Sequence, residues 1–181
     1  MQGIVNFASQ VGLIFASLLP PICYLGALGT FIYACWAFWR QAQPDNPFRD
    51  RPWLPALSLF FCGLLASFDR FLTRANRSFG SSVTVGLTDM VSYTPTGTSD
   101  ATTFLGANPG ETIVNVVTLF ELFFQAFGAL ACVLAAVFWY GTVKGTSDRS
   151  RGGCGVRFVF GIALINVVTI SQWVVNTFKI T

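Results

Sequence analysis

Charged residues are too scarce in this chain to cover the surface of a soluble domain. Only 10% of its 181 residues are Asp, Glu, Lys or Arg, and 53% are hydrophobic, whereas a soluble domain carries roughly a quarter charged residues. No Lys or Arg occurs between Ser78 and Val143. Because backbone groups in lipid must be hydrogen-bonded within the protein, long apolar runs predict helices. The sequence therefore predicts an all-α membrane protein.

Four apolar segments can be read along the chain, at residues 11–39, 53–68, 113–140 and 156–178. A membrane-spanning helix needs roughly 17–25 residues. The second segment extends to Leu72 if the charged residues before it lie at the membrane boundary. The third is long enough to tilt. We therefore expect about four transmembrane helices.

Two consecutive prolines, Pro20-Pro21, interrupt the first segment. Proline removes a backbone donor and its ring clashes with the preceding turn, so we expect the N-terminal helix to be broken there. The piece up to Leu19 would then lie at the membrane interface, and residues 22–39 would form the span. The predicted organisation is a first helical hairpin at 1–76, a polar Ser/Thr/Gly-rich extracytoplasmic loop at 77–112 and a second helical hairpin at 113–181.

Basic residues gather in the turn of each hairpin. Positive charge favours the cytoplasmic side of a membrane, so we expect both turns in the cytoplasm and both termini, with the polar loop, on the opposite side. Arg70, Arg74 and Arg77 run against this tendency. Beyond setting topology, the turns are suited to contact anionic lipid or to line a conduit for negatively charged cargo. Their basic residues are Arg40, Arg49, Arg51, Lys144, Arg149, Arg151 and the adjacent Arg157.

The stretch YLGALGTFIYACWAFW at residues 24–39 returns as AFGALACVLAAVFWYG at residues 126–141. Each copy is followed by a basic turn and a further apolar helix. The likeness is either an internal duplication or a chance resemblance between apolar helices. Small residues let helix backbones approach closely in lipid, so we expect glycines to pack helices within one copy of the chain or between copies. The candidate packing residues are Gly26, Gly29, Gly63, Gly128 and Gly161.

Glu121 is the only acidic residue well inside an apolar run. A carboxylate in a membrane normally faces a partner or an aqueous path. Arg70 and Arg74 lie at the same outer side in the predicted topology, and Gln125 lies one turn from Glu121 on the same helix face. We expect a structural ion pair between Glu121 and one of the arginines; a proton or ion relay is the alternative.

A polar stripe occupies the last apolar segment. Its residues recur at spacings of three and four, which places them on one face of a helix. The stripe suits either the lining of a pore or hydrogen bonds to a neighbouring helix. It consists of Asn166, Thr169, Gln172 and Asn176.

The chain has no histidine and five cysteines. The first fact excludes His-ligated zinc or haem and His-based acid–base catalysis. The cysteines form no C-x-x-C motif of a metal site. We find no activated nucleophile and no phosphate-binding loop, so we expect no enzyme activity, no metal and no cofactor, apart from a bound phospholipid that a membrane setting allows. Nothing indicates sequence-specific nucleic-acid binding.

A recognisable order of helices and turns occurs between Glu121 and Thr177, in the stretches ELFFQAFGALACVLAAVFWYGTVKG and RGGCGVRFVFGIALINVVTI. It comprises an apolar helix with Phe127-Gly128, a glycine-rich basic turn and a second helix with Gly161. This plan resembles the small integral membrane proteins of type IVB (I-type) conjugation and secretion systems, namely the IcmC/DotE, IcmD/DotP and TraQ/TraR-like components. Each half of the chain is also similar to the pilins of other type IV secretion systems, in which a short basic turn joins two apolar helices.

The resemblance implies a structural membrane subunit of a bacterial conjugative transfer or secretion apparatus, either a polymerising pilin-like subunit or a ring-forming one. Such a subunit would form homo-oligomers and contact membrane lipid and other membrane proteins of the system. It would reside in the bacterial inner membrane or be extruded into a cell-surface pilus. The alternative is a small ion or solute channel or transporter, with Glu121, Arg70 and the polar stripe along its path.

Overall fold

The computed structural model describes residues 2–45, 48–49, 51–78, 108–148 and 150–178, and this part of the chain contains helices and no strand. The all-α prediction is thus confirmed. Most of the predicted polar loop lies outside the described residues. The helices are α1 (Gln2–Gln41), α2 (Leu54–Ala66), α3 (Phe68–Ser78), α4 (Pro109–Leu119), α5 (Glu121–Lys144), α6 (Arg151–Ile165) and α7 (Val167–Phe178).

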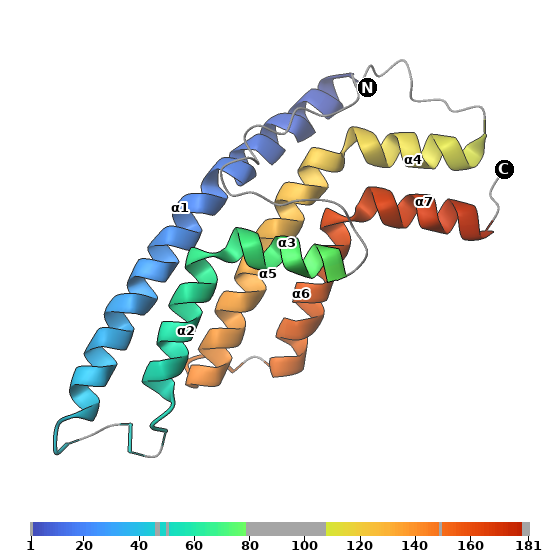
Figure 1. Ribbon diagram of the computed structural model, residues 1–181. Coiled ribbons are helices and arrows are strands. Elements are labelled where there is room, and N and C mark those ends of the chain that lie inside the picture. Colours follow the sequence, from blue (N-terminus) through green and yellow to red (C-terminus); the bar gives the residue numbers. More distant parts are fainter. Residues whose placement is uncertain (1, 46–47, 50, 79–107, 149, 179–181) are drawn as a thin grey trace.

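Four helices, α1, α2, α5 and α6, run side by side as an elongated bundle, and α3, α4 and α7 turn sideways at one end of it (Figure 1). α1 packs on both α2 and α5, and α5 packs on α6, so two hairpins meet along α1 and α5. In the described part of the chain, α1 and α5 are long and apolar enough to cross a membrane, and the number of spans rises to four if each bent helix pair counts as one. This composition is compatible with a membrane location.

Two helix pairs, α2 with α3 and α6 with α7, are each bent by 79°. At each bend a side chain donates to the carbonyl oxygen four residues earlier: Ser67 Oγ at 2.8 Å and Asn166 Nδ2 at 2.9 Å. At the same two residues the backbone leaves the α-helical region, with ψ of 31° at Ser67 and 22° at Asn166, and this change of dihedral angle turns the chain. The predicted second and fourth spans are therefore not single straight helices, and the third divides at Phe120 between α4 and α5.

The bends leave the straight parts of these spans short. α2 has 13 residues and α6 has 15, which gives about 20 and 22 Å at 1.5 Å per residue. The hydrocarbon core of a bilayer is about 30 Å thick. The straight part of each bent pair is therefore shorter than the hydrocarbon core of a bilayer.

α1 runs without a break through Pro20-Pro21, which corrects the predicted break and the separate interfacial helix. Each proline removes one backbone donor. However, Leu19 and Cys23 on either side are buried in the core shared with α5, and this packing holds the helix in register past the prolines. In lipid, the remaining backbone groups are best satisfied by continuing the helix. α1 therefore reaches 40 residues, or about 60 Å at 1.5 Å per residue.

A hydrogen bond between buried asparagines links α3 to the second bend. Nδ2 of Asn166 donates to Oδ1 of Asn76, in α3, at 3.2 Å. Asn76 is fully buried and Asn166 is only 6% exposed. On the same face of α3, Phe68 and Leu72 enter the apolar core formed with α1, α5 and α6. Apolar burial and this polar pair together hold α3 across the end of the bundle.

Replacing Asn166 by alanine tests this link. The Asn166→Ala change removes two side-chain hydrogen bonds and takes a buried partner from Asn76, so we expect a loss of about 1–3 kcal/mol in the free energy of unfolding. The measurement is denaturant unfolding of the detergent-solubilised protein. Asn176→Ala, at an exposed position of α7, is the control and should change the free energy by less than about 0.5 kcal/mol. Equal effects of the two changes would contradict the role of the asparagine pair.

Candidate functional site

Two predicted packing glycines, Gly128 and Gly161, bring the backbones of α5 and α6 into contact. A Cβ atom added to Gly128 would lie 2.6 Å from the carbonyl oxygen of Gly161, and one added to Gly161 would lie 2.8 Å from that of Gly128. Neither position admits a side chain unless the helices move apart. Cys132 also packs against Gly161, and its Sγ donates to the carbonyl of Phe158 at 3.5 Å. These glycines therefore pack helices within one copy of the chain.

The other three predicted glycines have different surroundings. A Cβ atom on Gly26 would meet Cδ1 of Leu65 at 3.1 Å, so Gly26 lies where α1 crosses α2. Gly29 and Gly63 are exposed, and an added Cβ atom at either would have no neighbour within 4 Å. Both positions thus face outward from the described part of a single copy.

The contact between α1 and α5 depends on residues that sequence reasoning missed. A Cβ atom on Gly12 would lie 3.2 Å from the backbone of Phe123 in α5. Ala8 and Ala16, one turn before and after Gly12, are also buried. Small residues spaced four apart are typical of close helix pairs in membranes, so this spacing would have predicted the contact. The expected break at Pro20 instead assigned Gly12 and its neighbours to a separate interfacial helix, away from the bundle.

Glu121 is the first residue of α5 and bonds to its own helix. Its Oε1 accepts a hydrogen bond from Nε2 of Gln125 at 2.9 Å, as their one-turn spacing suggests. Arg70 and Arg74 lie on α3 and are exposed, and between the described atoms of these side chains and Glu121 there is no ion pair. The structure thus brings Gln125, and neither arginine, to the Glu121 carboxylate.

A polar contact inside the bundle joins α2 to α5. The hydroxyl groups of Ser58 and Tyr140 lie 2.7 Å apart. Since Ser58 Oγ donates to the carbonyl of Leu54 at 3.0 Å, Tyr140 is the donor in the hydroxyl pair. Phe61 stacks on the Tyr140 ring with centroids 4.6 Å apart. Sequence reasoning missed this pair because single hydroxyl residues in apolar runs give no periodic signal.

The predicted polar stripe is divided between two surroundings. Asn166 is buried at the bend, and its Oδ1 has no hydrogen-bond partner in the described part of the chain. Thr169 is exposed on α7. Gln172 and Asn176 line a groove of about 250 Å³ between α4 and α7. The stripe therefore contributes to a helix contact at one end and to a surface groove at the other.

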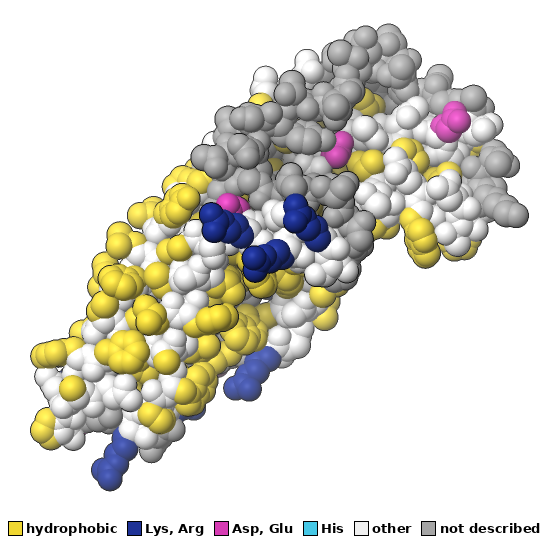
Figure 2. Space-filling model, viewed as in Figure 1, with side chains coloured by type: hydrophobic (Ala, Val, Ile, Leu, Met, Phe, Trp, Pro, Cys, Tyr) yellow, Lys and Arg dark blue, Asp and Glu magenta, His cyan; other side chains and the backbone are white. Residues whose placement is uncertain are grey.

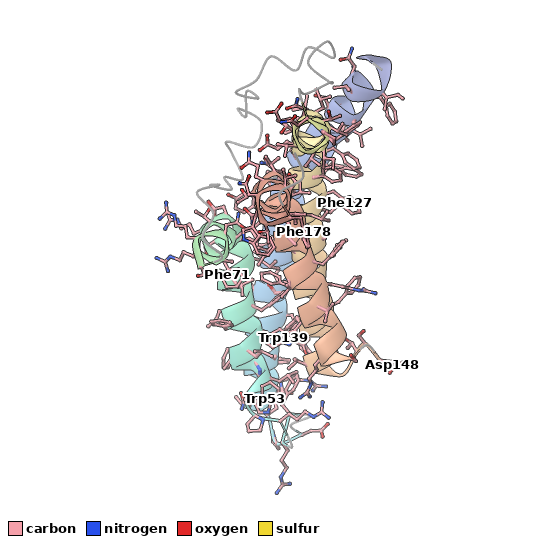
Figure 3. The ribbon with its side chains drawn as sticks, turned by 90° about the vertical axis from the view of Figure 1, so that its right-hand side faces the viewer. Trp53, Phe71, Phe127, Trp139, Asp148 and Phe178 are labelled. Carbon is pink, nitrogen blue, oxygen red and sulfur yellow. The ribbon has the colours of Figure 1, made fainter. Side chains whose placement is uncertain are left out.

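The two basic turns lie together at the end of the bundle opposite α3, α4 and α7. Figure 3 labels Trp53 and Asp148, one from each turn, at this end. Nζ of Lys144 lies 3.5 Å from the ring centroid of Tyr33 in α1, an arrangement favoured by the quadrupole of the ring. This is the placement that two like-oriented hairpins require.

The remaining predicted basic residues are spread around this end. The guanidinium groups of Arg40 and Arg157 each lie 5.9 Å from the centroid of an aromatic ring. Arg40 also donates to Gln43 at 3.1 Å. Arg49, Arg51 and Arg151 are exposed, and Arg149 lies outside the described residues.

The five cysteines are free thiols. Cys23 and Cys132 belong to the apolar core and Cys154 is buried at the start of α6, where a thiol behaves as a small hydrophobic side chain. Cys62 is half-buried and Cys35 is exposed on α1. Among the described residues, no group of three or more His, Cys, Asp or Glu side chains is placed to hold a metal ion.

Substitution of Gly128 tests the backbone contact between α5 and α6. Gly128→Ala adds a Cβ atom that meets the Gly161 carbonyl oxygen, so we expect the free energy of unfolding in detergent to fall by about 1–3 kcal/mol, as overpacking does in other cores. The matched control is Gly63→Ala, which adds the same atom in open space on α2. A Gly128→Ala protein as stable as the Gly63→Ala protein would show that the two backbones do not touch.

Comparison of the chain with protein-family models, with curated proteins and with solved structures gave no match.

Proposed function

We propose that this protein is a structural membrane subunit of a bacterial type IV (I-type) conjugative transfer or secretion apparatus, polymerising like a pilin or forming a ring. The observation that carries the structural role is the use of polar groups inside the bundle. Tyr140 bonds to Ser58 and Asn166 bonds to Asn76, and both bonds join helices. Groups used in this way fix helix positions, which suits a rigid building unit. The type of apparatus is supported by the sequence resemblance to its small membrane proteins, in which a basic turn joins two apolar helices.

Assembly into a homo-oligomer is supported by two unlike apolar faces. Large side chains are exposed on α1 at Leu25, Ile32 and Trp39, and on α6 at Val156 and Phe160. α1 and α6 lie on opposite sides of the bundle (Figure 1). Contacts between unlike faces of successive copies generate closed rings or open filaments. We propose that α1 of one copy packs on α6 of the next.

The proposed placement is the bacterial inner membrane, from which a pilus-forming subunit would be extruded to the cell surface. The basic turns would face the cytoplasm, since positive residues favour that side. Membrane lipid and other membrane proteins of the apparatus would be its partners.

A small channel or transporter, the alternative reading of the sequence, is less well supported by the geometry. The residues assigned to its path lie in different surroundings. Glu121 bonds to Gln125 at the start of α5, Asn166 is buried at a bend, and Arg70 is exposed on α3.

Disulfide cross-linking between copies tests the proposed packing of α1 on α6. Cys35 is exposed on α1, six residues before its end at Gln41, and Val156 is exposed on α6, five residues after its start at Arg151. The two positions are therefore similarly far from the helix ends that carry the basic turns. We expect oxidation of the Val156→Cys protein in native membranes to give a ladder of trimers and larger species on a non-reducing gel.

The double variant Cys35→Ser/Val156→Cys is the matched control, because a single reactive thiol on the packing faces allows dimers at most. The wild-type protein should also stop at dimers. If the Val156→Cys protein gives no species larger than a dimer, the head-to-tail packing is wrong.

Deletion of the gene tests the role in transfer. We expect deletion to abolish DNA or effector transfer and to leave solute uptake unchanged, because a structural subunit carries no solute. The wild-type gene should restore transfer, and Gly128→Leu should not, since α5 and α6 cannot pack. Immunoblots of membranes check that each variant accumulates. Normal transfer combined with altered uptake would favour the channel.

A further inference from the structure

An apolar groove of about 360 Å³ lies between α2 and α6, with α5 as its floor. Phe60 and Leu64 of α2 form one wall, and Gly155 and Phe158 of α6 form the other. Ala135, Ala136 and Trp139 of α5 line the floor. Its lining offers no charged side chain to an occupant. The groove therefore suits a hydrocarbon.

Helix α3 lies at one end of this groove and carries a cluster of arginines. Phe71 of α3 lines the groove beside Phe158, with ring centroids 5.8 Å apart. The arginines of α3 recur at spacings of four and three, which places Arg70, Arg74 and Arg77 on one face of the helix. All three are exposed, and Figure 2 shows the basic patch over α3 next to apolar surface. In the described residues none of the three takes part in an ion pair.

We infer that the groove and the arginines of α3 together bind one anionic phospholipid, with an acyl chain in the groove and the phosphate on the arginines. An amphipathic helix with a basic face lies at the depth of the lipid headgroups. Phe68 and Leu72 are buried on one side of α3 and the arginines are exposed on the other, so α3 has this character. Arginine is suited to phosphate because its planar fork of donors binds two oxygens at once. The inference rests on membrane insertion alone and is independent of the transfer role.

The charge beside the groove favours a lipid over an apolar helix of a second copy, because the lining itself is wholly apolar and the exposed arginines of α3 lie at one end of it. A narrow acyl chain can follow the groove along α5, and its phosphate would then lie beside the exposed arginines of α3.

Quenching of Trp139 by brominated lipid tests the site. Trp139 lines the groove (Figure 3), so the protein is prepared with Trp139 as its only tryptophan and reconstituted in phosphatidylcholine vesicles. Phosphatidylglycerol brominated in mid-chain should quench its fluorescence at lower mole fractions than phosphatidylcholine brominated at the same position. The other tryptophans, to be replaced by phenylalanine, are Trp36, Trp39, Trp53 and Trp173.

Loss of the arginines should remove this preference. Because a basic residue near anionic lipid contributes a factor of about five in affinity, Arg74→Gln should weaken the preference for phosphatidylglycerol about fivefold. Replacing all three arginines of α3 by glutamine should abolish it. The matched control removes three exposed arginines at the opposite end of the bundle and should leave the preference unchanged: Arg49→Gln, Arg51→Gln and Arg151→Gln.

Filling the groove separates chain binding from charge. An added Cβ atom at Gly155, which lines the groove, would have no neighbour within 4 Å, so we expect the side chain of Gly155→Leu to occupy part of the groove and to reduce quenching by both lipids. Equal quenching of the unsubstituted site by the two lipids would overturn the inference, since it would show ordinary lipid solvation. Weak quenching of the unsubstituted site by both lipids, together with a dimer in sedimentation, would also overturn the inference. A second copy of the chain would then occupy the groove.

Discussion

Close contact between helix backbones is the interaction on which the rest of this structure depends. Helices in lipid gain nothing from the hydrophobic effect by associating, so van der Waals contact over small residues must hold them together. Gly128 and Gly161 bring α5 to α6, and Gly12 brings α1 to α5. Because α1 also packs on α2, these contacts join two hairpins into one bundle. The basic turns lie at one end of it as a direct consequence of the hairpin geometry.

Buried polar groups determine the opposite end of the bundle. A buried amide is costly unless it is hydrogen-bonded, and Asn76 finds a partner in Asn166 when α3 lies across the bundle. The bends that allow this shorten the straight parts of α2 and α6, and they bring the arginines of α3 next to the apolar groove. α3 thus both supports the fold and supplies the charged end of the proposed lipid site.

Much of the helical plan could be predicted from the sequence, because long apolar runs and basic turns are strong signals in a membrane protein. Gly128 and Gly161, two of the predicted packing residues, lie where the backbones of α5 and α6 meet. The bends could not be predicted, because the bond that Ser67 makes to the carbonyl four residues earlier is also made by Ser58 and Thr142 inside straight helices. The break at Pro20-Pro21 was wrong because packing of the flanking residues on α5 outweighs two lost donors. That error also hid the contact at Gly12.

A bundle whose inner polar groups join helices, and whose outer faces are apolar on opposite sides, is suited to repeated assembly in a membrane. This account requires that two hairpins enter the membrane from the same side. The direct measurement is labelling of single cysteines placed in the two turns, at Arg49→Cys and Asp148→Cys, in a background free of other cysteines. A membrane-impermeant maleimide should leave both unlabelled in intact cells and label both once the cytoplasmic side is opened. Labelling of one turn, or of both, from outside intact cells would contradict the account.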